Sequence, residues 1–205
     1  MKNKTTKEHI METAIMVFAD KGYSGTTMDF IAKQANVNKA AIYYHLGNKK
    51  KLYFTVISNF IEKNREIMQK NYSPSLNSKT NLSNILRLLN NSNETQRAVF
   101  RILFREIASG LETLPKELFK EMSTIFLEMR EILKPSIDKN EINEKDTLIT
   151  HIFLFGSILL LNNLPIIRKK LISSGHFPLI KDFSHEEEIE NYINILINGF
   201  FIKGE

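Results

Sequence analysis

The side chains best suited to chemistry are concentrated in one basic segment, and their types fit contact with nucleic acid. Tyrosine, histidine and lysine donate hydrogen bonds to phosphates, whereas alanine lets a helix enter the DNA major groove and contact a thymine methyl group. Threonines at a helix start can bind phosphate on the opposite side of the groove. The residues predicted to contact DNA are Thr26, Thr27, Lys39, Ala40, Ala41, Tyr43, Tyr44, His45 and Lys49.

The charge distribution sets the same segment apart from the rest of the chain. The net charge of +5 arises entirely in the first 51 residues, which hold nine lysines against four acidic residues. The remaining residues hold nineteen basic and nineteen acidic side chains. A lysine run alone is typical of a solvated surface, and tyrosines alone are typical of packing. Their combination favours a nucleic-acid reader joined to a second, neutral module.

Three consecutive lysines, Lys49-Lys50-Lys51, occupy the first turn of a predicted helix. Cations at a helix N-terminus oppose the helix dipole, each at a cost of roughly some tenths of a kcal/mol. A phosphate bound to the exposed N–H groups of that turn would offset the repulsion. We therefore expect the start of this helix to lie beside the DNA backbone.

The elements that must position these residues begin with two helices. Thr5 and Glu8 form a capping box that begins the first helix, and Gly22 ends it. Thr26 or Thr27 caps the second helix.

A turn and a third helix follow. Asn36 lies in the turn, where asparagine tolerates a left-handed backbone, and Asn38 caps the third helix. Gly47 ends that helix, and Asn48 begins a long helix that reaches about Asn71. This order of elements predicts a helix-turn-helix whose second helix is exposed.

The rest of the chain also carries helical patterns and no convincing strand alternation. Ser73-Pro74-Ser75 indicates a linker, and Ser184 with Glu187 forms another capping box. The fold class is therefore all-α with about nine helices. We expect a helix-turn-helix domain over 1–50 and a helical domain over 51–205, with helix 48–71 as connector. Further helices are predicted near 80–91, 94–111, 114–134, 144–171 and 185–202.

The first quarter of the chain, Thr6 to Leu52, contains a characteristic set of short runs: Met11-Glu12-Thr13-Ala14, Val17-Phe18-Ala19, Lys21-Gly22-Tyr23, Thr26-Thr27-Met28, Ile31-Ala32, Val37, Ile42-Tyr43-Tyr44-His45, Asn48-Lys49 and Leu52. With these runs the segment resembles the N-terminal domain of TetR-family transcriptional regulators (the TetR/AcrR family). Asn36 and Ala40 stand where glycine is usual, Leu46 where phenylalanine is usual, and Lys50 where an acid is frequent, which bears on operator preference.

The resemblance implies a homodimer on a palindromic double-stranded DNA operator, usually as a repressor. It also implies that the last two helices form the dimer interface, as a four-helix bundle. Both helices are apolar on nearly all sides, so each must be covered on more than one side. The residues predicted for this interface are Leu154, Ile158, Leu161, Ile193, Ile197 and Phe200.

The family resemblance further implies an apolar cavity for a small hydrophobic effector. Phenylalanines at helical spacing are also typical of an ordinary core, and a polar side chain in an apolar helix can bond backbone instead of a ligand. Both readings stay open here. The residues predicted to line the cavity are Phe100, Phe104, Met122, Phe126, His151 and Phe155.

Several other classes of protein find no support in the sequence. The absence of cysteine excludes disulfides and cysteine-bound zinc and fits a cytoplasmic location. The sequence has no phosphate loop, HExxH motif or nucleophile elbow, and its five histidines are scattered, so we expect no enzyme activity, metal or cofactor. The longest apolar stretch, Ile152 to Leu161, falls short of the roughly 20 residues that span a bilayer, and we expect no membrane partner. A second interpretation is a DNA-binding protein of this fold that takes no effector and is controlled by a protein partner or acts architecturally.

Overall fold

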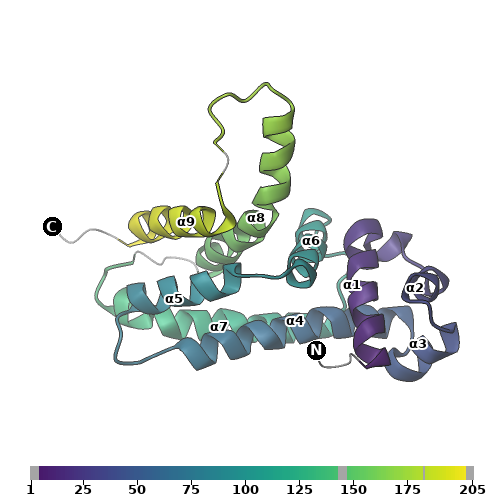
Figure 1. Cartoon of the computed structure of the whole chain (residues 1–205). Coiled ribbons are helices and arrows are strands. Elements are labelled where there is room, and N and C mark those ends of the chain that lie inside the picture. The colour runs from purple at the N-terminus through teal and green to yellow at the C-terminus, as the bar shows by residue number, and fades with distance from the viewer. Residues whose placement is uncertain (1–4, 143–146, 182, 202–205) are drawn as a thin grey trace. The chain divides into compact units, whose positions relative to one another are not determined.

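The computed structural model describes residues 5–142, 147–181 and 183–201, and these residues form nine α-helices and no strand (Figure 1). The all-α prediction is confirmed. The predicted helix start at 144 and end at 202 lie outside the described residues. The helices are α1 (Thr6–Gly25), α2 (Met28–Ala35), α3 (Lys39–Leu46), α4 (Lys49–Asn71), α5 (Ser78–Asn90), α6 (Glu94–Ala108), α7 (Glu117–Asp138), α8 (Thr147–Ser173) and α9 (His185–Phe200).

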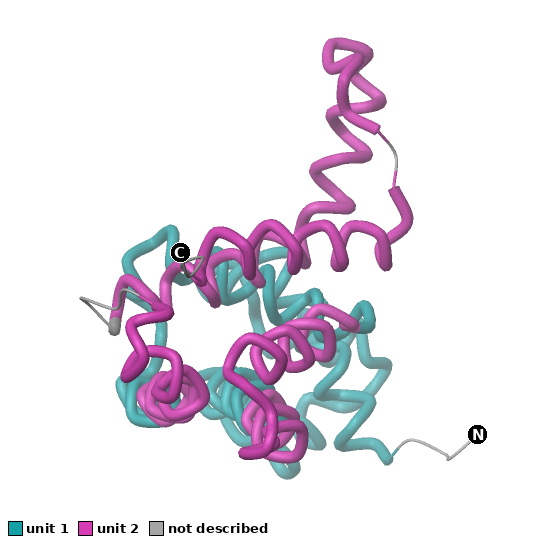
Figure 2. The backbone as a smooth tube through the Cα atoms, turned by 90° about the vertical axis from the view of Figure 1, so that its left-hand side faces the viewer, with its two compact units in different colours: residues 1–63, 93–122 teal, residues 64–92, 123–205 magenta. Residues whose placement is uncertain are grey.

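The chain divides into two compact units (Figure 2). Unit 1 comprises residues 1–63 and 93–122, and unit 2 comprises residues 64–92 and 123–205. This division is based on contacts between residues, and its borders differ from the predicted border between residues 50 and 51. The chain begins in unit 1, passes into unit 2 within α4 and returns to unit 1 at the start of α6.

The helix caps follow from local sequence, as predicted. The Thr5 hydroxyl accepts a hydrogen bond from the Glu8 N–H at 3.2 Å, and the Glu8 carboxylate accepts one from the Thr5 N–H at 2.8 Å. Of the two candidate threonines, Thr27 caps α2, because its hydroxyl accepts from the Phe30 N–H at 3.1 Å. The capping box of Ser184 and Glu187 at α9 is also present. Side-chain oxygens thus satisfy N–H groups that have no partner within the helix.

The core of unit 1 is built around α1, which packs along α6 and against α2 and α3. Its largest fully buried side chains come from all four of the first helices and include Ile10, Phe18, Ile31, Ile42 and Tyr53. Burial of each large apolar side chain contributes about 1.5–3 kcal/mol, which holds the short helices α2 and α3 in place.

Gly22 interrupts α1 with φ 70° and ψ 174°, a conformation that residues with a side chain rarely adopt. We expect Gly22→Ala to lower the free energy of unfolding by about 1–3 kcal/mol, because the strained backbone is retained and the new Cβ lies 2.9 Å from Arg105 Nη1. Chemical denaturation measures the change. Gly25→Ala is the matched control, since its Cβ meets only Lys21 Cβ at 3.5 Å. Equal losses for the two variants would contradict this account.

The core of unit 2 is formed by α5, α8 and α9. Polar contacts also join these helices: among them, Asn162 donates to the Asn90 side-chain oxygen at 3.0 Å, and Arg87 forms a bidentate pair with Glu190 at 2.6 and 3.0 Å. The apolar side chains buried here include Leu82, Ile85, Leu86, Leu154, Ile158, Leu161, Ile193 and Ile197.

The residues predicted for the dimer interface lie mostly within this core. Five of its six residues (all but Phe200) are buried within the chain itself. The exposed apolar side chains of the same two helices are different ones: Leu148, Ile149, Ile152, Phe153, Leu160 and Ile195. A helix that is apolar on all sides carries no periodic signal for which side faces outward, and the interface itself stays a prediction.

Within α8, residues Leu148–Ser173 are long and apolar enough to cross a membrane, since an 18-residue window of this stretch reaches a mean hydropathy of 1.6. Core helices of soluble proteins meet the same criteria. The absence of a membrane partner stays a prediction.

Candidate nucleic-acid interface

The candidate site is a helix-turn-helix formed by α2 and α3 in unit 1. Asn36 follows α2 in the left-handed conformation, with φ 51° and ψ 46°, as predicted for the turn. The Val37 N–H donates to the Ala32 carbonyl at 3.1 Å and closes the end of α2. Asn38 caps α3 through the Ala40 N–H at 2.9 Å. The tight turn fixes α3 against the first two helices.

Helix α3 buries one side and exposes the other. Ile42 and Leu46 are buried in the core of unit 1. On the outer side Tyr44 is 85% exposed and Tyr43 is 48% exposed. His45 is also exposed, and its ring lies 5.0 Å from that of Tyr44. This outer side therefore presents hydrogen-bond donors on a rigid support.

The start of α3 combines small side chains with a cation. Ala40 is exposed and Ala41 is half-buried, so backbone is accessible there. Lys39 Nζ lies 2.8 Å from the Asp29 carboxylate, and this hydrogen bond raises the pKa of Lys39 above its ordinary value. Because both side chains are exposed, the pair is weak and a phosphate can replace Asp29 as the partner of Lys39.

Lys49 lies at the N-terminus of α4, as predicted, and is half-buried. Its Nζ is 4.3 Å from the centre of the Tyr23 ring, a cation–π distance. Burial lowers the pKa of Lys49, which means that the chain only partly compensates its charge. An anion beside it would favour the charged form.

Thr26 requires a correction to the predicted set. It is 1% exposed, and its hydroxyl donates to the Gly22 carbonyl at 2.7 Å. That hydroxyl supports the end of α1 and is not presented at the surface. Thr27 is exposed and remains in the set. Tyr23, whose ring packs on Lys49, was not among the predicted site residues. Its place one residue after Gly22, where the first helix was predicted to end, could have drawn attention to it.

The predicted effector residues divide between the two units. In unit 2 the Phe126, His151 and Phe155 rings form one cluster, with centroid distances of 4.2, 5.7 and 6.3 Å. In unit 1 Phe100 packs on the Phe60 ring at 4.9 Å, and Phe104 is 46% exposed.

The sixth predicted residue, Met122, is half-buried and belongs to unit 1. The cavity as a whole stays a prediction.

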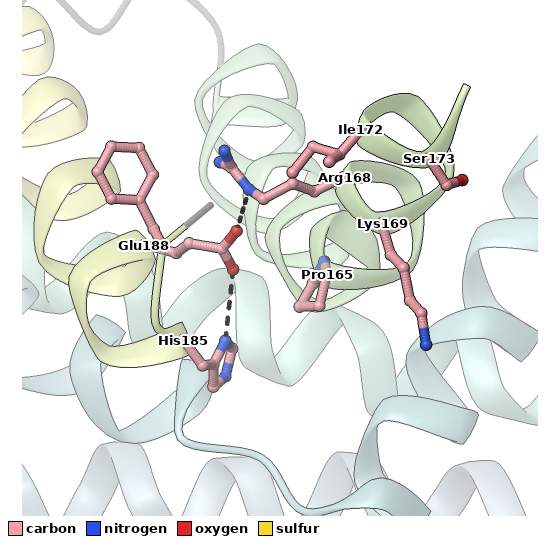
Figure 3. A pocket seen from close by; sticks show the side chains of 8 residues that line it. Pro165, Arg168, Lys169, Ile172, Ser173, His185 and Glu188 are labelled. Carbon is pink, nitrogen blue, oxygen red and sulfur yellow. Dashed lines mark hydrogen bonds and ion pairs between the residues drawn. The ribbon is translucent and has the colours of Figure 1, made fainter. Parts of the chain in front are cut away.

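A separate hollow of about 420 Å³ lies in unit 2 beside the end of α8 (Figure 3). Arg168 Nε donates to Glu188 at 2.5 Å, and His185 Nδ1 lies 3.7 Å from the same carboxylate. Arg168 and Glu188 therefore form an ion pair at this hollow. The hollow is lined by Pro165, Arg168, Lys169, Ile172, Ser173, Phe183, His185 and Glu188, so the predicted effector residues are not part of it.

Comparison with known proteins agrees with this geometry. Residues 10–56 match the model of the bacterial regulatory proteins of the tetR family. The chain is 42% identical over 74 residues to the negative transcriptional regulator IcaR of the biofilm operon icaADBC from Staphylococcus aureus strain Newman, covering 33% of this chain and 39% of IcaR. The IcaR of Staphylococcus epidermidis is 45% identical over 53 residues, covering 26% and 29%. The chain thus matches well under half the length of these relatives.

Solved structures extend the likeness over the whole chain. A protein of Clostridium perfringens that is described as a fatty acid metabolism regulator is 27% identical to this chain, with a TM-score of 0.71. The match covers 95% of this chain and 100% of the other. The ketosteroid transcriptional regulator KstR2 of Mycobacterium tuberculosis shares the fold, with a TM-score of 0.73 at 14% identity and 98% coverage of each chain. Residues 10–56 thus match the tetR family of bacterial regulatory proteins, and the chain as a whole has the fold of solved regulators of this kind.

Proposed function

We propose that the protein is a homodimeric, sequence-specific DNA-binding transcriptional regulator, acting in the cytoplasm as a repressor that a small, largely apolar effector releases from its operator. The observation that carries this proposal is the outer side of α3, where Tyr43, Tyr44 and His45 are exposed together on a helix fixed by two buried residues. The matched family and the IcaR relatives support the same assignment.

In this proposal α3 enters the major groove, with Ala40 and Ala41 allowing close approach. Tyr43, Tyr44 and His45 donate to phosphates or base edges. Lys39 exchanges its Asp29 partner for DNA. Thr27 and Lys49 contact the backbone on the two sides of the groove, and the start of α4 adds its N–H groups to the phosphate site.

The proposed dimer forms through the exposed apolar face of α8 and α9. Ile149, Ile152, Phe153 and Leu160 recur at spacings of three and four along α8, with Gly156 among them in open space. An exposed stripe of this kind on a soluble domain is typical of an interface. Two-fold pairing would present two α3 helices to a palindromic site.

Binding is tested by selecting duplexes from a random-sequence library with the full chain. We expect an inverted repeat to be enriched and its affinity to fall steeply with salt, by about 0.9 in log–log slope for each phosphate contact. Failure to prefer any duplex over an unrelated one would overturn the proposal.

The effector is tested on the selected duplex. The Clostridium perfringens relative is described as a fatty acid metabolism regulator, which makes fatty acids and their coenzyme A thioesters of graded length the first probes. Release of DNA by one of them, together with a rise in thermal stability, is the expected result. If none releases DNA, the partner-controlled alternative replaces the effector.

A further inference from the structure

A buried carboxyl group in α6 stands out because it takes no part in the proposed DNA contacts. Glu106 is 3% exposed, and its Oε1 accepts hydrogen bonds from the Tyr53 hydroxyl at 2.6 Å and from the Thr113 hydroxyl. Its Oε2 is buried and has no hydrogen-bond partner. Burying a carboxyl group with one oxygen unsatisfied lowers the stability of the fold, so the position of Glu106 calls for a reason other than stability.

The turn after α6 is held in an unfavourable conformation that brings Thr113 to this carboxyl group. Gly110 and Leu111 both have positive φ, 73° and 65°. Leucine rarely adopts this region, because its Cβ approaches the backbone too closely. The Leu111 N–H donates to the Glu106 carbonyl at 2.7 Å, which ties the turn to the same residue. Strained backbone beside a buried polar group is typical of functional positions.

Tyr53 connects the carboxyl group to the DNA-binding surface. The Tyr53 ring lies 4.9 Å from both the Phe18 and the Tyr23 rings, and the Tyr23 ring lies 4.3 Å from Lys49 Nζ. Burial, and next the bond to Glu106, raises the pKa of Tyr53 far above its ordinary value, so the hydroxyl remains a donor. Glu106, Tyr53, Tyr23 and Lys49 thus form one continuous series of contacts within unit 1.

Arg105, the residue before Glu106 in α6, binds the backbone close to Tyr23. Arg105 donates through Nη1 to the Phe18 carbonyl at 3.3 Å and through Nη2 to the Asp20 carbonyl at 3.2 Å. These carbonyls precede the interruption of α1 at Gly22, directly before Tyr23. Helix α6 therefore fixes both the backbone that carries Tyr23 and the ring that packs on it.

We propose that Glu106 is a positioning residue for DNA binding, which fixes the Lys49 ammonium group at the start of α4 through Tyr53 and Tyr23. This inference rests on the proposed function, since it requires that Lys49 contact a DNA phosphate. Without the bond to Glu106, the Tyr53 ring can tilt, Tyr23 loses its support, and the Lys49 side chain samples more positions. Ordering it on DNA then carries a larger entropic penalty.

The test uses the full chain and the duplex selected by the wild type from the random library. We expect Tyr53→Phe, which removes one oxygen, to weaken binding by about 3- to 10-fold and to reduce the salt slope. In a Lys49→Ala background the same change should have no further effect, because the affected contact is already gone. Tyr192→Phe is the matched control, since it removes a part-buried hydroxyl that bonds Ser157 in unit 2, and the affinity of this variant for DNA should be unchanged.

Glu106→Gln and Thr113→Val complete the set and guard against misfolding of Tyr53→Phe. Glutamine keeps an acceptor oxygen for Tyr53 and should retain most of the affinity, whereas Thr113→Val should reproduce part of the loss. Full affinity for folded Tyr53→Phe and Thr113→Val, or an additive loss in the Lys49→Ala background, overturns the positioning role. Failure of the proposed function looks different, because then the wild type selects no duplex.

Discussion

Ile152→Glu is expected to convert the protein to a monomer and to reduce operator binding by more than about 100-fold, the largest effect of any single change considered. Ile152 is 61% exposed on the apolar face of α8, so glutamate is tolerated in the free chain. In a dimer the new carboxylates would lie desolvated against apolar side chains and close to each other. One half-site held by a single α3 then contributes only half of the contacts.

Sedimentation and DNA titration of the same preparation measure both consequences. Leu179→Glu is the matched control, because Leu179 is 92% exposed but lies in the connection between α8 and α9. It should remain dimeric with full affinity. A monomeric Ile152→Glu that still binds the operator fully would show that assembly and DNA binding are independent, and a dimeric one would place the interface elsewhere.

Tyr44→Ala is expected to weaken operator binding by about 10- to 100-fold with unchanged thermal unfolding. The side chain is 85% exposed and takes no part in the core, so its loss leaves the fold intact. A dimer loses the contact at both half-sites, and each lost hydrogen bond of about 1 kcal/mol corresponds to a factor near five.

Salt dependence distinguishes this contact from a charged one. Tyr44 is neutral, so Tyr44→Ala should leave the salt slope unchanged, whereas Lys49→Ala should reduce it by about one for each half-site. Tyr72→Ala serves as the control, because Tyr72 is also exposed but follows the end of α4 in unit 2. Tight binding by Tyr44→Ala would remove α3 from the proposed interface.

The parts of the fold that sequence could predict are those that depend on neighbours along the chain. Asn36 and Asn38 were recognisable because the left-handed turn and the helix cap need only residues within a few positions. Ile42 and Leu46 are apolar and four residues apart, a spacing that indicates one inward side of α3 and so an exposed side opposite it. The sequence could not tell which of Thr26 and Thr27 caps α2, because either residue type can serve as a cap. The burial of Thr26 depends on packing.

The parts that sequence could not predict depend on distant residues. Glu106 and Tyr53 are 53 positions apart, and a glutamate on a helix with many charges gives no sign of burial. The faces of α8 and α9 were equally ambiguous, since Leu154 and Ile152 have the same character and opposite exposure. Where hydrophobicity is uniform around a helix, only the three-dimensional neighbours decide which side is covered.

The return of α6 to unit 1 has a consequence for synthesis of the protein. A nascent chain that ends before residue 93 has already made α1, α2 and α3, but it lacks the helix that packs along α1 and the arginine that binds the Phe18 and Asp20 carbonyls. Ribosomes add about 5–20 residues each second, so the DNA-binding unit waits for its last helix for some seconds. Recombination between related genes is limited in the same way, because unit 1 needs α6 as well as the first four helices. A segment cut after residue 63 would carry the matching family sequence without the helix that completes its fold.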